Sequence, residues 1–421
     1  MNKNFKVVFS KARGALMVVN ELTSSVQVKG TKTVIAAAVA SLVAGGAMAA
    51  DTAKPGALLS WNGTELVGQA AGEGLVYSTK DGVLTITATG QKTGAEGVPG
   101  YGVLTNIYNA DATGGSDILA KTAVKISGST FKDNQSTNAG GAVTLWQDGS
   151  KDSTALAHSI SGSTFSGNSA NLGGAVALMN QMAFDKKDGT TLSERNTYQE
   201  NTALKGGAVY VEGSVFASKN DDFTNNKAIS TKSENSFGGA IYVGNNGSLT
   251  VENGSFNTNE SGHMGGALFV TGEGSVKMTD VTFDGNTSGY GGAAMFNGHH
   301  DNEANLGSVN KASITATNVK YLNNNASKAG GGLWLYTKTK YEQTGGSFVG
   351  NKANQMAGAV FVKGAEAVFT DVLFENNVVR NENAVVAGGA VYVDPVKNSN
   401  VPGGTVPASA KFVITKDMTY S

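Results

Sequence analysis

The sequence contains no cysteine among its 421 residues. Disulfide bridges, zinc sites with thiolate ligands and cysteine nucleophiles are therefore excluded. A chain without thiols also suits passage through an oxidising compartment, where free cysteines can cross-link before folding is complete. The absence favours an exported protein over a thiol-dependent enzyme.

Charge and proline are scarce as well. Asp, Glu, Lys and Arg make up 15% of the chain, and 32 basic residues balance 33 acidic ones to give a formal net charge of −1. The chain therefore has no strongly basic region that would indicate nucleic acid or an anionic membrane surface as a partner. The 5 prolines stand against 57 glycines, which excludes collagen and proline-rich linkers and is typical of short strands joined by tight turns.

An apolar run near the N-terminus has the layout of a signal peptide. Val34–Val43 follows Lys29 and Lys32 and precedes a small-residue stretch that ends in Ala49 and Ala50. Basic, apolar and small-residue parts in this order are the three regions of a cleavable signal. The run is shorter than the ~20 apolar residues of a membrane-spanning helix, so we expect cleavage at Ala49 or Ala50 rather than a membrane anchor.

A second basic and apolar segment, Met1–Leu22, precedes this signal. It resembles the extended signal peptide region of large proteins that Gram-negative bacteria export by type V secretion, including autotransporters and two-partner secreted adhesins. The resemblance covers roughly residues 1–25 and departs at Ala15–Met17, where family members often carry a bulkier aromatic. It implies slow export across the inner membrane and a final place at the cell surface, in the outer membrane or outside the cell.

The rest of the chain is repetitive. An aromatic residue followed three positions later by asparagine occurs nine times, about 30 residues apart on average, and each copy precedes Gly-Gly-Ala or a close variant. Self-similarity at this period indicates one coil of a β-solenoid per repeat. The pairs are Phe131/Asn134, Phe165/Asn168, Tyr198/Asn201, Phe223/Asn226, Phe256/Asn259, Phe283/Asn286, Tyr321/Asn324, Phe348/Asn351 and Phe374/Asn377.

Each glycine pair is followed by two apolar residues that lie two positions apart, such as Val176 and Leu178 or Leu268 and Val270. Alternation with period 2 predicts a strand with one apolar face. A single repeat cannot bury this face, whereas coils stacked ~4.8 Å apart bury it against their neighbours. The predicted fold is therefore all-β, a right-handed parallel β-helix preceded by a cleaved signal peptide.

The motif residues have structural roles in this prediction. Glycine pairs such as Gly173 and Gly174, or Gly265 and Gly266, permit sharp corners where a Cβ would clash. Asparagines at equivalent positions are expected to hydrogen-bond to the turn backbone and to one another, and the Phe and Tyr rings to stack in a ladder.

The combination of Gly-Gly-Ala-aliphatic with Phe-x-x-Asn resembles the repeats of chlamydial polymorphic outer membrane proteins and related autotransporter passengers. The resemblance spans about residues 120–395, with Tyr198 and Tyr321 in place of Phe, Gly332 in place of alanine and Ala357 in place of the first glycine. It implies a secreted or surface-displayed passenger that acts as an adhesin or interaction stalk on a Gram-negative bacterium. The implied partner is a host-cell or matrix protein or glycan.

The predicted organisation has four parts. Residues 1–50 are the extended signal peptide, 51–119 an N-terminal β cap with turn signals at 62–63 and 81–82, 120–395 the nine repeats, and 396–421 the start of a further coil. We recognise no translocator barrel, whose strands need ~9–11 residues each. The expectation is an outer-membrane translocator, in cis if the chain is a truncated autotransporter or in trans as in two-partner secretion.

The alternative function is a β-helix enzyme that acts on polysaccharides, a lyase or hydrolase with clustered carboxylates. The adjacent pair Asp221 and Asp222 is interpreted as a solvated turn, and His299, His300 and Asp301 as a solvated loop rather than a metal site. The nucleophile turn Gly-Asp-Ser-Gly does not occur. The sequence therefore predicts no catalytic, metal-binding or cofactor-binding residue.

One position of the second strand is unexpected. The residue between the two apolar positions points to the opposite face, yet seven of the nine are large and apolar or aromatic. Rings ~4.8 Å apart would form a ribbon that binds a glycan or a protein surface, unless the rings merely stack on one another or a loop covers them. The candidate binding stripe consists of Tyr210, Tyr242, Phe269, Trp334, Phe361 and Tyr392.

Overall fold

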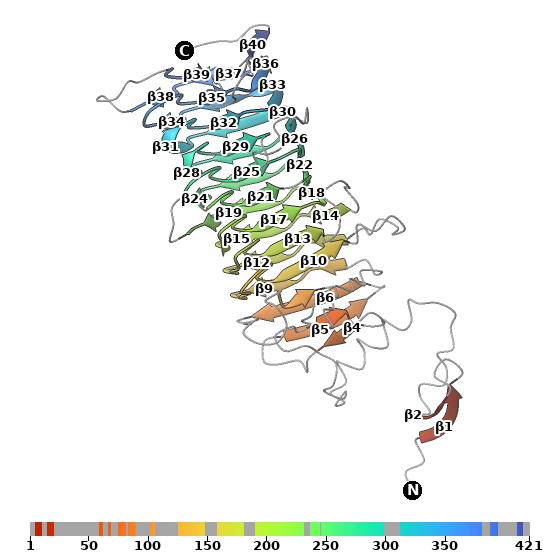
Figure 1. Cartoon of the computed structure of the whole chain (residues 1–421). Helices are drawn as coiled ribbons and strands as arrows, with labels where there is room; N and C mark the ends of the chain where they lie inside the picture. The colour runs from red at the N-terminus through yellow and green to blue at the C-terminus, as the bar shows by residue number, and fades with distance from the viewer. Residues whose placement is uncertain are drawn as a thin grey trace, which may run out of the picture.

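The computed structural model shows coils of short strands stacked along one axis (Figure 1). Apart from short strands before residue 90, it describes residues 102–105, 125–147, 158–180, 190–230, 236–244, 246–298, 312–380, 388–394 and 411–415. Within the described residues, no helix is long and apolar enough to cross a membrane.

Three sheets run along the solenoid, and the longest receives two strands, or one long strand, from each coil. Its nineteen strands are β5 (Leu75–Lys80), β6 (Val83–Thr89), β8 (Lys125–Ser127), β9 (Thr130–Lys132), β11 (His158–Ser161), β12 (Thr164–Ser166), β14 (Thr190–Glu194), β15 (Thr197–Gln199), β18 (Val215–Lys219), β19 (Asp222–Thr224), β22 (Ser248–Glu252), β23 (Ser255–Asn257), β26 (Ser275–Thr279), β27 (Thr282–Asp284), β30 (Ala312–Leu322), β33 (Thr339–Val349), β36 (Glu366–Thr370), β37 (Leu373–Glu375) and β40 (Lys411–Thr415).

The other two sheets contain the strands after each glycine pair and after each asparagine corner. The twelve-stranded sheet comprises β3 (Leu59–Trp61), β4 (Leu66–Gly68), β7 (Leu104–Thr105), β10 (Val143–Gln147), β13 (Val176–Asn180), β17 (Val209–Glu212), β21 (Ile241–Gly244), β25 (Leu268–Thr271), β29 (Ala294–Asn297), β32 (Leu333–Tyr336), β35 (Val360–Lys363) and β39 (Val391–Asp394). The seven-stranded sheet comprises β16 (Thr202–Ala203), β20 (Lys227–Ala228), β24 (Glu260–Ser261), β28 (Thr287–Tyr290), β31 (Asn325–Ala329), β34 (Lys352–Ala353) and β38 (Val378–Val379). Separately, β1 (Phe5–Ser10) and β2 (Ala15–Asn20) pair antiparallel.

Equivalent motif residues pair in register from coil to coil. Phe256 of β23 lies opposite Phe283 of β27, and Leu268 of β25 lies opposite Ala294 of β29, in parallel pairs. Parallel pairing of each strand with its counterpart one repeat later is what stacked coils require. The prediction of an all-β parallel β-helix is confirmed.

Antiparallel hairpins precede the first coil. β5 pairs with β6, and β3 with β4, while the predicted turns at 62–63 and 81–82 lie outside the described residues. β6 then pairs in parallel with the first coil, where Ala88 lies opposite Phe131. The hairpins thus occupy the sheet edge beside the first coil, whose backbone groups would otherwise be open to pairing with another chain.

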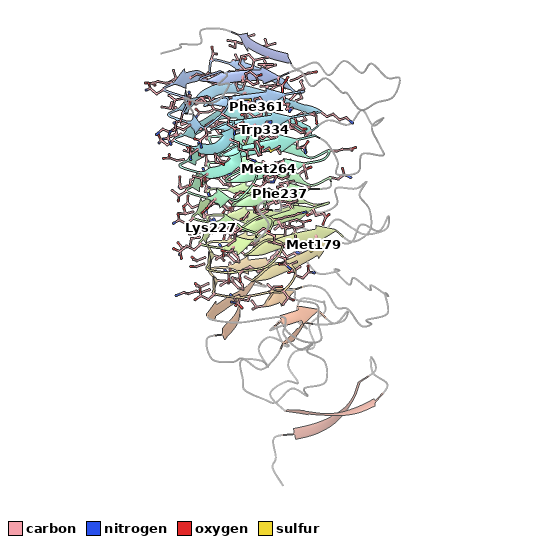
Figure 2. The ribbon with its side chains drawn as sticks, turned by 60° about the vertical axis from the view of Figure 1, so that its left-hand side comes forward. Met179, Lys227, Phe237, Met264, Trp334 and Phe361 are labelled. Carbon is pink, nitrogen blue, oxygen red and sulfur yellow. The ribbon has the colours of Figure 1, made fainter. Side chains whose placement is uncertain are left out.

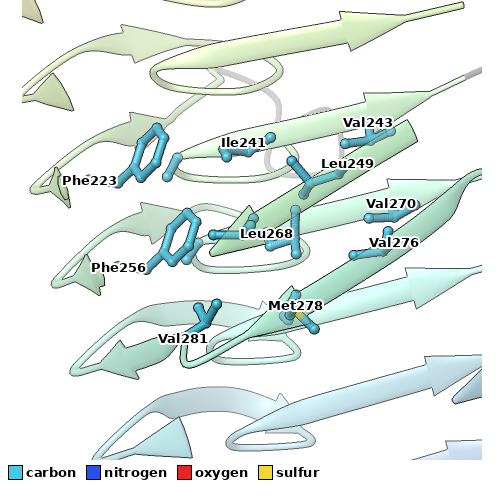
Figure 3. Packing of buried hydrophobic residues seen from close by; sticks show 14 of the residues in the cluster. Phe223, Ile241, Val243, Leu249, Phe256, Leu268, Val270, Val276, Met278 and Val281 are labelled. Carbon is cyan, nitrogen blue, oxygen red and sulfur yellow. The ribbon is translucent and has the colours of Figure 1, made fainter. Parts of the chain in front are cut away.

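The aromatic residue of each motif points into the solenoid and stacks on its neighbours. Phe223 and Phe256 are fully buried beside Ile241 and Leu268, and the centroids of the two rings lie 4.7 Å apart (Figure 3). The stack runs through all nine rings at centroid distances of 4.5–5.1 Å. Stacking of this kind adds about 0.5–1.5 kcal/mol per pair to the burial of the rings. The sequence-predicted members Phe131, Phe165, Phe256 and Phe283 all lie in this ladder.

The motif asparagines form a second ladder. The side-chain amide of Asn259 donates to Oδ1 of Asn286 at 3.0 Å and to the carbonyl of Phe223 at 3.0 Å. Its backbone N–H donates to the same Oδ1 at 2.9 Å. Because these groups are buried, each lost partner would cost about 1–3 kcal/mol. The same bonds join Asn134 to Asn168 and continue through the later coils to Asn377.

The two glycines of a pair are needed for different reasons. Gly265 has a φ of +64°, in the left-handed region, whereas a Cβ on Gly266 would lie 1.9 Å from the carbonyl oxygen of Gly292 in the next coil. Gly173 and Gly174 repeat this arrangement. The first glycine therefore makes the corner, and the second lets the coils approach.

Candidate functional site

Some sequence-predicted positions lie outside the described residues. They are the cleavage positions Ala49 and Ala50 and the cluster of His299, His300 and Asp301. Among the residues that the structure describes, no group of three or more His, Asp or Glu side chains is placed to hold a metal ion.

The aromatic stripe lies on the outer face of the twelve-stranded sheet, with one residue on each strand from β17 to β39 except β29, where Met295 stands at this position. Tyr210, Tyr242 and Phe269 are each 5% exposed, Phe361 is 4% exposed and Trp334 7% exposed. Tyr392, the last member, is half-buried. The expectation of an open ribbon is therefore wrong for these side chains, and the alternative of stacked and covered rings describes them.

Stacking between coils hides the ring faces. The rings of Tyr210 and Tyr242 have centroids 5.2 Å apart and planes 6° apart, and those of Phe361 and Tyr392 lie 5.4 Å and 15° apart. Each stacked face is thus directed at the neighbouring coil rather than at solvent. The stacked faces of these four rings are therefore not available to a ligand.

A second row of side chains, which we name the cover row, packs against the stripe. It consists of the residue immediately before the glycine pair, or before Ala357–Gly358, in the first eight repeats, and these residues form backbone bridges from coil to coil. Sequence analysis missed this row, although large apolar residues directly before Gly-Gly were its signal. Phe237 and Met264 of this row follow one another along the solenoid, below Trp334 and Phe361 in Figure 2. The cover row comprises Ala139, Leu172, Lys205, Phe237, Met264, Tyr290, Ala329 and Met356.

The outer surface of the cover row is apolar and partly open. Leu172, Phe237, Met264, Tyr290 and Met356 are all half-buried, and they pack on the buried stripe as one cluster. Two of the five are methionines, whose unbranched thioether side chains are flexible. Surfaces of this composition adapt to apolar side chains of a partner.

Two lysines lie over aromatic rings of this surface. Nζ of Lys205 is 5.2 Å from the ring centroid of Tyr242 and 6.0 Å from that of Phe237, and Nζ of Lys328 is 4.7 Å from that of Tyr290. Each contact is a cation–π interaction. Neither ammonium forms an ion pair with a carboxylate of the described residues.

Polar groups mark both ends of the stripe. The hydroxyl of Tyr210 donates to Glu212 at 2.9 Å, and burial together with this carboxylate raises the pKa of Tyr210 far above its usual value. Toward the other end, Nε1 of Trp334 is buried with no hydrogen-bond partner among the described residues. An unsatisfied buried donor costs about 1–3 kcal/mol.

The interpretation of Asp221 and Asp222 as one solvated turn is wrong for Asp221, which is fully buried. Its Oδ1 accepts from the backbone N–H of Asn196 at 2.7 Å and its Oδ2 from the Ser218 hydroxyl at 2.7 Å. Burial raises the pKa of this carboxyl to about 6, although the hydrogen bonds, including one from Ser193, act in the opposite direction. Asp222 is exposed on the outer face.

Comparison with known families gives two matches. Residues 1–50 match the extended signal peptide of the type V secretion system. Residues 222–244, from β19 to the end of β21, match the Chlamydia polymorphic membrane protein repeat. No curated protein and no solved structure matches the chain. Together with the stacked coils, the two matches support a type V secretion passenger with repeats similar to those of polymorphic membrane proteins, and they indicate export to the outer membrane or cell surface.

Proposed function

We propose that the passenger acts as an adhesin or interaction stalk that binds a host-cell or matrix protein or glycan. The observation that carries the proposal is the unbroken series of ring and asparagine ladders from the first repeat to the ninth. At ~4.8 Å per coil, nine coils span about 40 Å. The inner rings and asparagines of the ladders hold the coils together. The side chains on the outer face are not needed for this and can bind a partner.

The competing function, a polysaccharide lyase or hydrolase, is less well supported. Glycosidases place two carboxyl groups about 5–9.5 Å apart on either side of the scissile bond. Asp221 faces the interior and Asp222 the exterior, so the adjacent acidic pair cannot flank one substrate. We therefore propose a non-enzymatic role, with an outer-membrane translocator supplied in cis or in trans.

Attachment and turnover assays test the two functions side by side. Cells that display the passenger are expected to attach to host cells or matrix proteins more than cells with the gene deleted. Purified passenger incubated with a panel of polysaccharides is expected to yield no new reducing ends and no unsaturated products. Clear turnover would overturn the stalk function, and so would attachment that is unaffected by the deletion.

A further inference from the structure

We propose that the outer surface around Met264 is a docking site for an acidic amphipathic helix of a protein partner. The proposal rests on the proposed function as an interaction stalk and names the partner class. It starts from the half-buried apolar side chains of the cover row and the two lysines that lean over them. A solenoid needs apolar residues inside, whereas these lie on its outer face.

The charges on this surface point to an anionic partner. Lys205 and Lys328 hold their ammonium groups against ring surfaces, and no carboxylate of the described residues pairs with them. Elsewhere on the solenoid surface lysines do pair with acids of the next coil, as Lys227 does with Glu260 at 3.0 Å. Charge complementarity therefore favours carboxylates delivered by another molecule.

The spacing of the lysines selects the shape of the partner. Their ammonium groups lie over Tyr242 and Tyr290, whose coils are separated by the single coil that contains Met264. Two steps of ~4.8 Å put the two coils whose rings lie under the ammonium groups about 10 Å apart along the axis. Side chains seven positions apart on one face of a helix are ~10.5 Å apart. Same-side positions of an extended peptide are ~7 or ~13 Å apart and fit less well.

The apolar part of the helix would meet the coil between the lysines. Residues three and four positions after the first acid lie on the same face of the helix, midway between the two carboxylates. There they would contact Met264 and the edge of Phe237, whose ring is 5.0 Å from that of Phe269. Because these side chains are half-buried, they can pack against the apolar face of a helix but expose less apolar surface than insertion into a lipid bilayer needs.

The probe is a 15-residue helical peptide with two glutamates seven positions apart and two leucines midway between them. Its binding to the full passenger is measured by fluorescence anisotropy, and we expect it to weaken as salt is raised. Lys205→Glu with Lys328→Glu turns two attractions into repulsions, so we expect a loss of at least about tenfold in affinity. A peptide with lysines in place of the glutamates should bind this double variant better than it binds the parent.

Lys227→Glu, on the seven-stranded sheet, is the matched control and should leave peptide affinity unchanged. Absence of peptide binding to the parent, or equal binding to the double variant, would overturn the proposal. Binding to phosphatidylserine vesicles without binding to the peptide would also overturn it, because the partner would then be a lipid. Host-cell attachment separates the two proposals: if the double variant attaches as well as the parent, the docking site is wrong and the stalk function stands.

Discussion

Replacing Asp221 by asparagine should stabilise the passenger at neutral pH. Asp221 is the last member of a short buried ladder in which Ser163 and Asn196 precede it, and the next coil has Gly254 at this position. No described basic side chain pairs with the buried carboxylate. An asparagine would continue the ladder without a charge.

The magnitude follows from the pKa. Burial raises the pKa of Asp221 from an ordinary 3.8 to about 6. The folded chain therefore holds this proton more tightly than the unfolded chain, and the stability contributed by the group falls as pH rises from about 4 to about 6. A rise of the pKa from 3.8 to about 6 corresponds to a destabilisation of the folded chain by roughly 3 kcal/mol above pH 7. Below pH 4 the Asp221 carboxyl is protonated in both the folded and the unfolded chain, and the destabilisation disappears.

Hydrogen exchange of the segment 190–230, measured from pH 4 to pH 8, gives the free energy of local opening for each variant. We expect Asp221→Asn to be about 2–3 kcal/mol more stable than the parent at pH 7.5 and nearly equal to it at pH 4. Asp222→Asn, on the exposed outer face, is the control and should change little at either pH. A gain that does not depend on pH, or a loss at pH 7.5, would refute the reasoning.

Three further predictions concern the ladders and the register. Asn259→Ala should lower the free energy of unfolding by about 3 kcal/mol or more in urea, because it leaves several buried donors and acceptors unpaired. An effect no larger than that of Asn257→Ala, at the half-buried end of β23, would contradict the ladder. Ala357 has a φ of +54°, so Ala357→Gly should raise the free energy of unfolding by about 1 kcal/mol. Gly265→Ala should lower it, because Gly265 has a φ of +64°. Destabilisation by Ala357→Gly together with stabilisation by Gly265→Ala would disprove backbone strain. Thr224 and Asn257 pair in register, so the double variant Thr224→Cys with Asn257→Cys should form a disulfide on oxidation, with no native cysteine to compete. Equal cross-linking of a cysteine pair shifted by two residues would show a different register.

The repeat architecture could be predicted because its signals are local. Phe256 and Leu268 recur at fixed offsets from Asn and Gly-Gly in every repeat, and period-2 alternation fixes which side chains face inward. Stacking then follows, because one coil cannot bury its own apolar face.

Exposure on the outer face could not be predicted in this way. The solvent exposure of Phe269 depends on the turn before Gly265, because Met264 of that turn packs against the cluster that contains Phe269. Alternation within the strand contains no information about that turn. Asp221 was misjudged for a similar reason. It lies in the corner between β18 and β19, where it accepts from Asn196 of the preceding coil and from Ser218 three residues earlier, and strand alternation contains no information about that corner.

Cysteine labelling on intact cells tests the central claim, an exported β-helix displayed at the surface, most directly. Lys227 is exposed and Val243 is fully buried. In cells that export the passenger, a membrane-impermeant maleimide should label Lys227→Cys on intact cells and Val243→Cys only after unfolding. Labelling of Lys227→Cys that requires cell lysis, or equal labelling of both variants on intact cells, would contradict the account.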